Sequence, residues 1–236
     1  MDSIPALAMA QELGYAEVDP SDDIQGNDSA YKLSILATLA FHSRVRPEDV
    51  YCEGISQLDI RDFRYAKELG YSIKLLAIAK KKVGELEVRV HPALIPDTHL
   101  LARVTGVYNA VEIEGQLLGR ILLHGEGAGS EPTTSAVLGD LLEVGKHILH
   151  GDSTKRDIFL GDPLAIRDMG DLETSYYFRL NVVDMSGVLA SITRVFGDLD
   201  ISIASVIQKD ADRNVGTAEL VTVSYTHLTL PTILLV

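Results

Sequence analysis

The chain has 236 residues, and its 21 Lys and Arg against 34 Asp and Glu give a formal charge of −13 with neutral histidines. This acidic balance argues against nucleic acids and anionic membranes as partners, because clustered cations hold such partners. A single cysteine and no uncharged apolar run of about 18 residues exclude an intrachain disulfide and a membrane span, so we expect a cytoplasmic globular protein.

The first thirty residues carry seven acids and no Lys or Arg. Their pattern predicts a short helix over 3–13 closed by Gly14, followed by an acidic loop over 17–28 that is rich in turn-forming residues. A second helix is predicted through YKLSILATLAF, with Asp28 at or near its N-cap. Acidic groups are therefore concentrated just ahead of an apolar helix.

Strand patterns dominate from Val50 onward. One helix, DIRDFRYAKEL, interrupts the predicted strands VYCEGI, SIKLLAIAK, ELEVRVHPAL, VYNAVEIEG and LLGRILLHG. The junctions at 82–84 and 114–116 predict hairpin turns. An amphipathic helix, SAVLGDLLEVGKHIL, follows. We therefore predict an α+β fold over 1–150, in which a mixed, largely antiparallel sheet packs on helices.

A second unit is predicted after a change in composition. Residues 151–174 are rich in Asp and Gly without periodicity and are interpreted as a linker. The stretch 175–223 then predicts strand, helix, strand and strand, which is the order of a ferredoxin-like βαββ unit.

The strongest candidate site combines Lys32 with the carboxylates ahead of it. Asp28 is four residues from Lys32, so the two side chains share one helix face. Carboxylates hold the ammonium group of an amino acid, and a lysine can act as a proton donor, so the cluster suits an amino-acid substrate. The alternative is a solvated acidic loop with an i,i+4 ion pair, and spacing alone favours that alternative.

The string GYAEVDPSDDIQGNDSAYKLSILA resembles the substrate-site signature of homoserine dehydrogenases. The KLLA strand and GEGAGSEPTTSAVLGDL extend the similarity to that family's catalytic and dimerising domain over 1–150. The resemblance implies NAD(P)H-dependent reduction of L-aspartate 4-semialdehyde to L-homoserine, on the pathway to threonine, methionine and isoleucine. It implies that Lys32 protonates the aldehyde oxygen and that Glu17, Asp23 and Asp28 bind the substrate.

The glycine cluster HGEGAGSEPTT connects a predicted strand to a predicted helix. Ser130 stands where a G-x-G-x-x-G fingerprint needs its third glycine, so this is not a Rossmann core. A tight strand-to-helix connection explains the glycines equally well. The resemblance implies that Gly129, together with Gly14, approaches the nicotinamide cofactor, which is NADP or NAD.

Residues from Tyr176 onward, YYFRLNVVDMSGVLASITRVFGDLDISIASVIQKD, resemble the start of an ACT domain. Such βαββαβ modules pair with a second copy and bind an amino-acid effector, here implied to be threonine, at the turn from Asp184 to Gly187. Gly187 permits close backbone approach, and the following helix N-terminus favours a carboxylate. The alternative is a dimerisation module without a ligand.

The predicted ACT domain is truncated, and residues 224–236 are interpreted as a non-native tail. The run from Val223 to Thr232 resembles the translation of a transposon-derived sequencing adapter. It offers β-branched residues and Pro231 where the fold requires an amphipathic helix. The family often has Thr-His after this strand, so native Thr226 and His227 are the alternative.

Homoserine dehydrogenases also carry an N-terminal Rossmann domain, and this chain begins after it. We therefore expect a fragment that is inactive in isolation, from an enzyme that forms a homodimer or a higher homo-oligomer. The alternative from another functional class is a non-catalytic amino-acid-binding regulatory module. The seven histidines show no ligand spacing, so no metal site is predicted.

Overall fold

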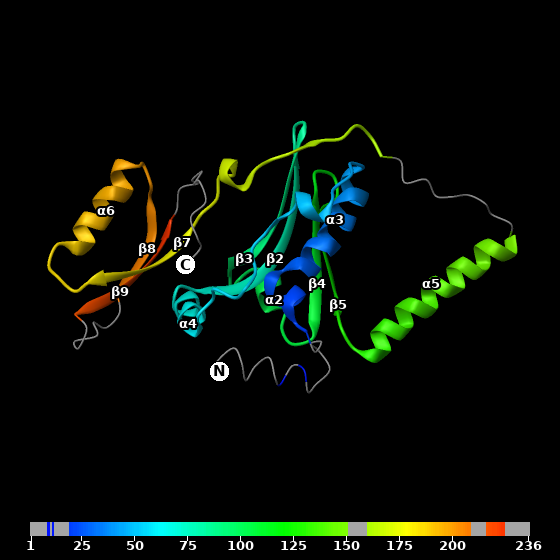
Figure 1. Cartoon of the computed structure of the whole chain (residues 1–236), viewed down its shortest axis with the longest axis horizontal. Coiled ribbons are helices and arrows are strands. Elements are labelled where there is room, and N and C mark those ends of the chain that lie inside the picture. The colour runs from blue at the N-terminus through cyan, green and yellow to red at the C-terminus, as the bar shows by residue number, and fades with distance from the viewer. Residues whose placement is uncertain (1–8, 10, 12–18, 151–159, 209–215, 225–236) are drawn as a thin grey trace.

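The computed structural model describes residues 9, 11, 19–150, 160–208 and 216–224, arranged as two successive units (Figure 1). Most of the predicted N-terminal helix, Gly14, Glu17 and residues 225–236 of the predicted tail lie outside these ranges. Within them, no helix is both long and apolar enough to cross a bilayer.

The centre of the first unit is a long antiparallel hairpin of β2 (Tyr71–Lys82) and β3 (Glu85–Pro96). The predicted turn joins these strands, and Gly84 adopts there a φ of +78°, which favours glycine. Two short strands, β1 (Tyr51–Cys52) and β6 (Ala165–Ile166), pair in parallel with the other edge of β3. The predicted mixed, largely antiparallel sheet is therefore confirmed.

Strand β6 lies within 151–174, the stretch interpreted as a linker, and connects it to the first sheet. Leu164 and Ile166 pack against the core of the first unit. The backbone N–H of Arg167 also donates to the carbonyl oxygen of Leu86 over 2.9 Å. A two-residue strand has no periodicity to reveal it, because its conformation depends on the available edge of β3.

Helix α3 (Asn27–Phe41) covers one face of this sheet (Figure 1). Its inward-facing residues pack against alternate residues of β3 and against two residues of the segment between α3 and β1. The buried residues of this core are Ala30, Leu33, Ala37, Val45, Val50, Leu86, Val88 and Val90. The segment ahead of α3, predicted as a loop over 17–28, contains the short helix α2 (Ser21–Gln25). Ser and Asp favour helix N-termini as well as turns, which explains the error.

The other face of β3 carries a buried polar row, in which Glu87, Arg89 and His91 are 4%, 7% and 8% exposed. Burial raises the pKa of Glu87, but hydrogen bonds from Lys82 and Arg89 outweigh burial and lower it. Arg89 Nε donates to His91 Nε2 over 3.2 Å, and His91 Nδ1 lies 2.8 Å from the carbonyl oxygen of Pro92. These contacts fit a neutral imidazole, and burial lowers the pKa of His91.

Acidification should destabilise the fold through His91. Because the pKa of the folded form lies below the ordinary value of 6.5, neutral His91 contributes its full stability above that value. This contribution to stability is lost as the pH falls below 6.5 and through the pKa of the folded form, since the unfolded chain binds the proton more readily. We expect the Tm of the wild type to fall more between about pH 7.5 and about pH 5.5 than the Tm of His91→Gln. The exposed His124→Gln is the control, and equal pH slopes for wild type and His91→Gln would contradict the prediction.

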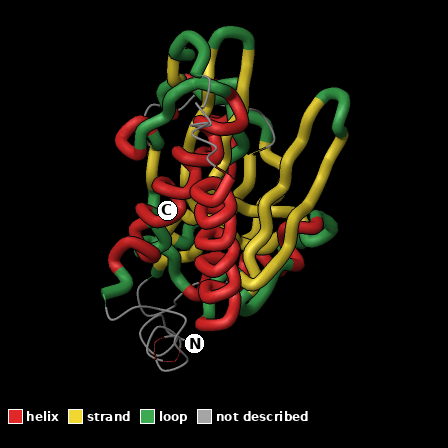
Figure 2. Tube along the Cα trace, turned by 90° about the vertical axis from the view of Figure 1, so that its right-hand side faces the viewer, coloured by secondary structure: helices red, strands yellow, loops and turns green. Residues whose placement is uncertain are grey.

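The second predicted hairpin forms a separate two-stranded sheet of β4 (Tyr108–Gly115) and β5 (Gly119–Glu126). Its turn lies at 116–118, slightly later than predicted. The following helix, α5 (Ser130–His150), contributes no buried residue and extends away from the sheets (Figure 1). The perpendicular view from the side of α5 shows this helix in front of the strands (Figure 2). The predicted packing of helices on the first sheet is confirmed by α3 and by α4 (Ile60–Glu68).

The second unit has the predicted βαββ order, with β7 (Tyr177–Val183), α6 (Val188–Asp198), β8 (Ile203–Gln208) and β9 (Thr217–Ser224). Its antiparallel sheet has the strand order β7–β9–β8. One face packs on α6, where the rings of Phe178 and Phe196 meet edge to face at 5.4 Å.

The other face of that sheet packs on α4 (Ile60–Glu68), which follows β1 in the first unit. Tyr65 of α4 shares a buried cluster with Tyr177, Val221 and Val223. Strand β9 continues through Ser224, whose backbone N–H donates to the carbonyl oxygen of Tyr176 over 2.8 Å. Ser224, the first residue of the predicted tail, is therefore part of the last described strand.

Candidate functional site

Gly26 joins α2 to α3 and holds the start of α3 against the sheet. Its φ of +83° favours glycine, and a Cβ at this position would lie 3.2 Å from both Cys52 Sγ and Val90 Cγ1. Its carbonyl oxygen accepts a hydrogen bond from the backbone N–H of Ala30 over 3.0 Å. Conformation and space thus both require glycine here, and the first turn of α3 sits on β1 and β3.

The Asp28–Lys32 pair lies on the solvent side of that first turn. Lys32 Nζ is 2.6 Å from Asp28 Oδ2, and the two side chains are 64% and 41% exposed, with Lys32 the more exposed. The predicted shared helix face is therefore confirmed, and Asp28 lies near the N-cap as predicted, in the first turn after the N-cap residue Gly26. An exposed i,i+4 pair contributes only about 0.3–0.5 kcal/mol to helix stability. The fold therefore has little need of this pair, and its polar atoms are accessible to a ligand.

Further carboxylates lie on α2 and just before it. Asp22 and Asp23 are exposed, and Asn27 Nδ2 donates to Asp22 Oδ1 over 3.1 Å. The side chain and backbone of Ser21 donate to Asp19 and lower the pKa of that carboxyl group. Within the described part of the chain, no hydrogen bond or ion pair joins Asp23 to Lys32. The structure places Asp23 on the same helical junction as the Asp28–Lys32 pair without direct contact.

The predicted cofactor glycines are only partly described. Gly14 lies outside the described residues, as does the predicted substrate ligand Glu17. Gly129 lies in the turn from β5 to α5 with a φ of +124°, a conformation that side chains rarely adopt. Among the described residues, no hydrogen bond links this turn to the Asp28–Lys32 pair.

The predicted effector turn forms a defined depression of about 290 Å³ between β7 and α6, lined by residues 182–189 with Gln208 and Leu220. Gly187 precedes α6 as its N-cap residue, with a φ of +94° and open space where a Cβ would stand. The backbone N–H of Asp184 donates to the carbonyl oxygen of Gly216 over 2.9 Å. The structure therefore brings Asp184 and Gly187 together at one depression, next to a helix N-terminus.

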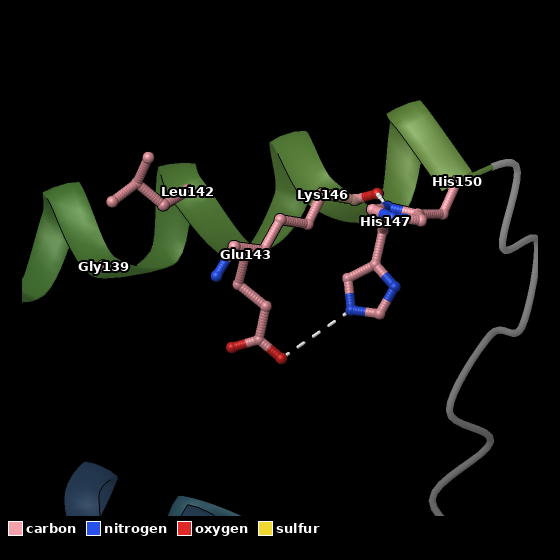
Figure 3. A pocket seen from close by; sticks show the side chains of 6 residues that line it. All are labelled: Gly139, Leu142, Glu143, Lys146, His147 and His150. Carbon is pink, nitrogen blue, oxygen red and sulfur yellow. Dashed lines mark hydrogen bonds and ion pairs between the residues drawn. The ribbon is translucent and has the colours of Figure 1, made fainter.

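A larger depression of about 510 Å³ runs along α5 (Figure 3). It is lined by Gly139, Leu142, Glu143, Lys146, His147 and His150, which all belong to that helix. His147 Nε2 lies 3.7 Å from Glu143 Oε1. Across the described ranges, no group of three or more His, Cys, Asp or Glu side chains is arranged to hold a metal ion. We assign no chemistry to this surface.

A polar network between the two units was missed from the sequence. Asp62 of α4 accepts hydrogen bonds from Tyr177 and Arg179 of β7. The available signal was Arg179 itself, a charged residue within the apolar strand pattern YYFRLNVV. A charge on a strand face that packs inward requires a partner, but the pattern does not identify which one.

Comparisons with known proteins agree with the two units. A family model for homoserine dehydrogenase matches residues 3–142, and one for the ACT domain matches residues 176–234. Homoserine dehydrogenase of Corynebacterium glutamicum is 40% identical, covering 96% of this chain and 51% of the relative. The homoserine dehydrogenase of Mycobacterium tuberculosis strain H37Rv is 42% identical, covering 96% of this chain and 53% of the relative.

The solved structures give the same result. The crystal structure of a homoserine dehydrogenase from Thiobacillus denitrificans has a TM-score of 0.84 and 43% identity, covering 96% of this chain and 52% of that chain. A homoserine dehydrogenase from Staphylococcus aureus at pH 6.0 has a TM-score of 0.66 and 29% identity. The chain spans about half the length of the relatives that it matches.

Proposed function

Since the chain belongs to the homoserine dehydrogenase family, we propose that it forms the substrate-binding and regulatory half of an NAD(P)-dependent enzyme. The reaction is the reduction of L-aspartate 4-semialdehyde to L-homoserine. The observation that carries the proposal is the accessible Asp28–Lys32 pair at the start of α3. The fold gains little from this pair, whereas the reaction requires a proton donor beside the substrate carbonyl.

The nicotinamide cofactor supplies the hydride when it is bound, and the turn at Gly129 fits its approach because no Cβ stands there. Lys32 then gives a proton to the carbonyl oxygen as the hydride reaches the carbonyl carbon, so the alkoxide is neutralised as it forms. Asp28 orients the ammonium group of Lys32, since its Oδ2 lies 2.6 Å from Lys32 Nζ. Glu17 and Asp23 bind the amino-acid end of the substrate. In the reverse direction, Lys32 takes the proton of the homoserine hydroxyl group.

The second unit has the role of an amino-acid sensor. An α-carboxylate fits the N-terminus of α6 beside Gly187, and Asp184 suits the ammonium group. L-Threonine is the effector that we propose for this depression. The enzyme acts in the cytoplasm as a homodimer or a higher homo-oligomer. A non-catalytic sensor is the second candidate function, since the depression alone supports amino-acid binding.

Activity can be tested in a chimera. Residues 1–236 of this chain are joined behind the part of the Thiobacillus denitrificans relative that precedes the matched region. We expect homoserine-dependent reduction of NADP⁺ or NAD⁺ by the purified chimera, because the joined part completes the cofactor site. The joined part alone and the 236-residue chain alone are the controls and should show no turnover. A folded chimera that does not oxidise homoserine would refute the enzymatic function and favour the sensor.

A further inference from the structure

The Asp62 carboxylate is a buried junction between the two units. Its side chain is 2% exposed, and its Oδ1 accepts from Arg179 Nε over 2.7 Å and from Tyr177 Oη over 2.8 Å. Its Oδ2 accepts from the backbone N–H of Asp59 over 2.8 Å. Oδ1 therefore holds strand β7 of the second unit, while Oδ2 holds the residue that caps α4 and also accepts from Arg179 Nη2 over 3.4 Å.

Glu219 of β9 completes this network from the second unit. It accepts from Arg61 and Tyr65 of α4, and Arg179 Nη1 lies 3.5 Å from its Oε1. The neighbouring cluster of Tyr65, Tyr177 and other apolar side chains is non-directional, so the polar contacts determine how the sheet is oriented on α4. Removing one charged partner would weaken the compensation of the other, since Asp62 would keep Tyr177 and Arg179 would keep only the longer contact with Glu219.

The loop that ends at Asp59 leads back to the candidate catalytic helix. Residues 53–58 follow β1, and the backbone N–H of Ile55 donates to the carbonyl oxygen of Ile24 over 2.8 Å. A Cβ on Gly54 would lie only 2.2 Å from the same oxygen. The loop is thus packed directly on the end of α2, next to Gly26, where the helix of Asp28 and Lys32 begins.

We propose that Asp62 and Arg179 are positioning residues that couple the effector turn to the Asp28–Lys32 pair. Arg179 lies on β7, the strand that runs into the turn at Asp184, so a ligand that shifts this turn displaces β7 against Asp62. Asp62 passes the displacement to the loop through Asp59, and the loop contacts the junction ahead of α3. This inference rests on the proposed function and specifies how the same site is regulated.

Hydrogen exchange of the 236-residue chain tests the coupling without any enzyme activity. We expect Arg179→Met to accelerate exchange of the amides in 24–32 by roughly 3- to 30-fold, the scale of coupling along such contacts. Arg194→Met, an exposed arginine on α6, is the matched control and should leave these amides unchanged. Arg179→Lys keeps the charge and should recover part of the protection. Acceleration confined to α4 and the second sheet would overturn the proposal, since a purely structural bond would have that effect.

The chimera provides the second readout. L-Threonine should raise the KM for homoserine by about 5-fold or more in the wild type and in Arg194→Met. In Arg179→Met and Asp62→Asn this response should fall below about 2-fold while L-threonine still binds, as measured by calorimetry. An undiminished response in both variants would overturn the coupling. An inactive wild-type chimera would instead refute the proposed function, and the exchange measurement would then decide the coupling by itself.

Discussion

Replacing Lys32 with Ala should lower kcat for homoserine oxidation in the chimera by roughly 10²- to 10⁴-fold, the usual contribution of a positioned acid or base. The fold should be almost unaffected, because the lost i,i+4 ion pair contributes only about 0.3–0.5 kcal/mol. Steady-state kinetics and thermal unfolding of the same preparation separate the two effects. Lys67→Ala, at an exposed lysine near the end of α4, is the control and should retain normal kcat.

Lys32→Arg distinguishes proton transfer from ion pairing. Arginine preserves the charge and can still pair with Asp28, but its guanidinium does not release a proton at neutral pH. If Lys32 acts as the acid, Lys32→Arg should remain nearly as inactive as Lys32→Ala. Recovery of most of the activity by Lys32→Arg would show that the residue acts only through its charge, which is the alternative ion-pair interpretation.

Replacing Gly54 with Ala should lower the free energy of unfolding by about 1–3 kcal/mol, the usual cost of overpacking. The added methyl group would meet Ile24 O at 2.2 Å and Gln25 Cα at 2.6 Å, and these backbone atoms cannot rotate away. Urea unfolding of the 236-residue chain measures the loss. In the chimera, the same change should also impair homoserine oxidation, because it displaces the junction ahead of Asp28.

Gly145→Ala is the matched control for this substitution. Gly145 lies within α5, and nothing stands within 4 Å of a Cβ at that position. Alanine should therefore be neutral or stabilise the helix by about 0.5–1 kcal/mol, since it restricts the unfolded chain. Equal unfolding free energies for Gly54→Ala and the wild type would show that the loop at 53–58 can move away from α2 without cost.

Features that depend on neighbouring residues could be predicted from the sequence. The β2–β3 hairpin follows from alternation on both sides of a turn that ends in Gly84, and the face shared by Asp28 and Lys32 follows from helical spacing. The βαββ order of the second unit was predictable for the same reason. The hairpin and the shared helix face each lie within one pair of adjacent strands or one helical turn, and the βαββ order is a succession of such local patterns along the chain.

Features that depend on distant partners could not be predicted. Asp62 and Arg179 are 117 residues apart, and neither shows in the local pattern which charge it meets. Strand β6 exists only because β3 leaves an edge for Ala165 and Ile166. At the candidate site, the sequence indicates which carboxylates precede Lys32, but the close packing of Gly26 on Cys52 and Val90 depends on tertiary structure.

The strand order β7–β9–β8 has a consequence for synthesis on the ribosome. Among the three described strands of this sheet, the central one is the last to be translated, so β7 and β8 lack their strand partner β9 until residue 224 has left the exit tunnel. Until then, Glu219 of β9, the partner of Arg61 and Tyr65, is missing, and β7 and β8 expose the edges that β9 later pairs with. The first unit can complete its long hairpin from adjacent strands much earlier, since only two residues separate them. Nascent chains stalled before β9 should therefore be the preferred clients of chaperones that bind exposed strands.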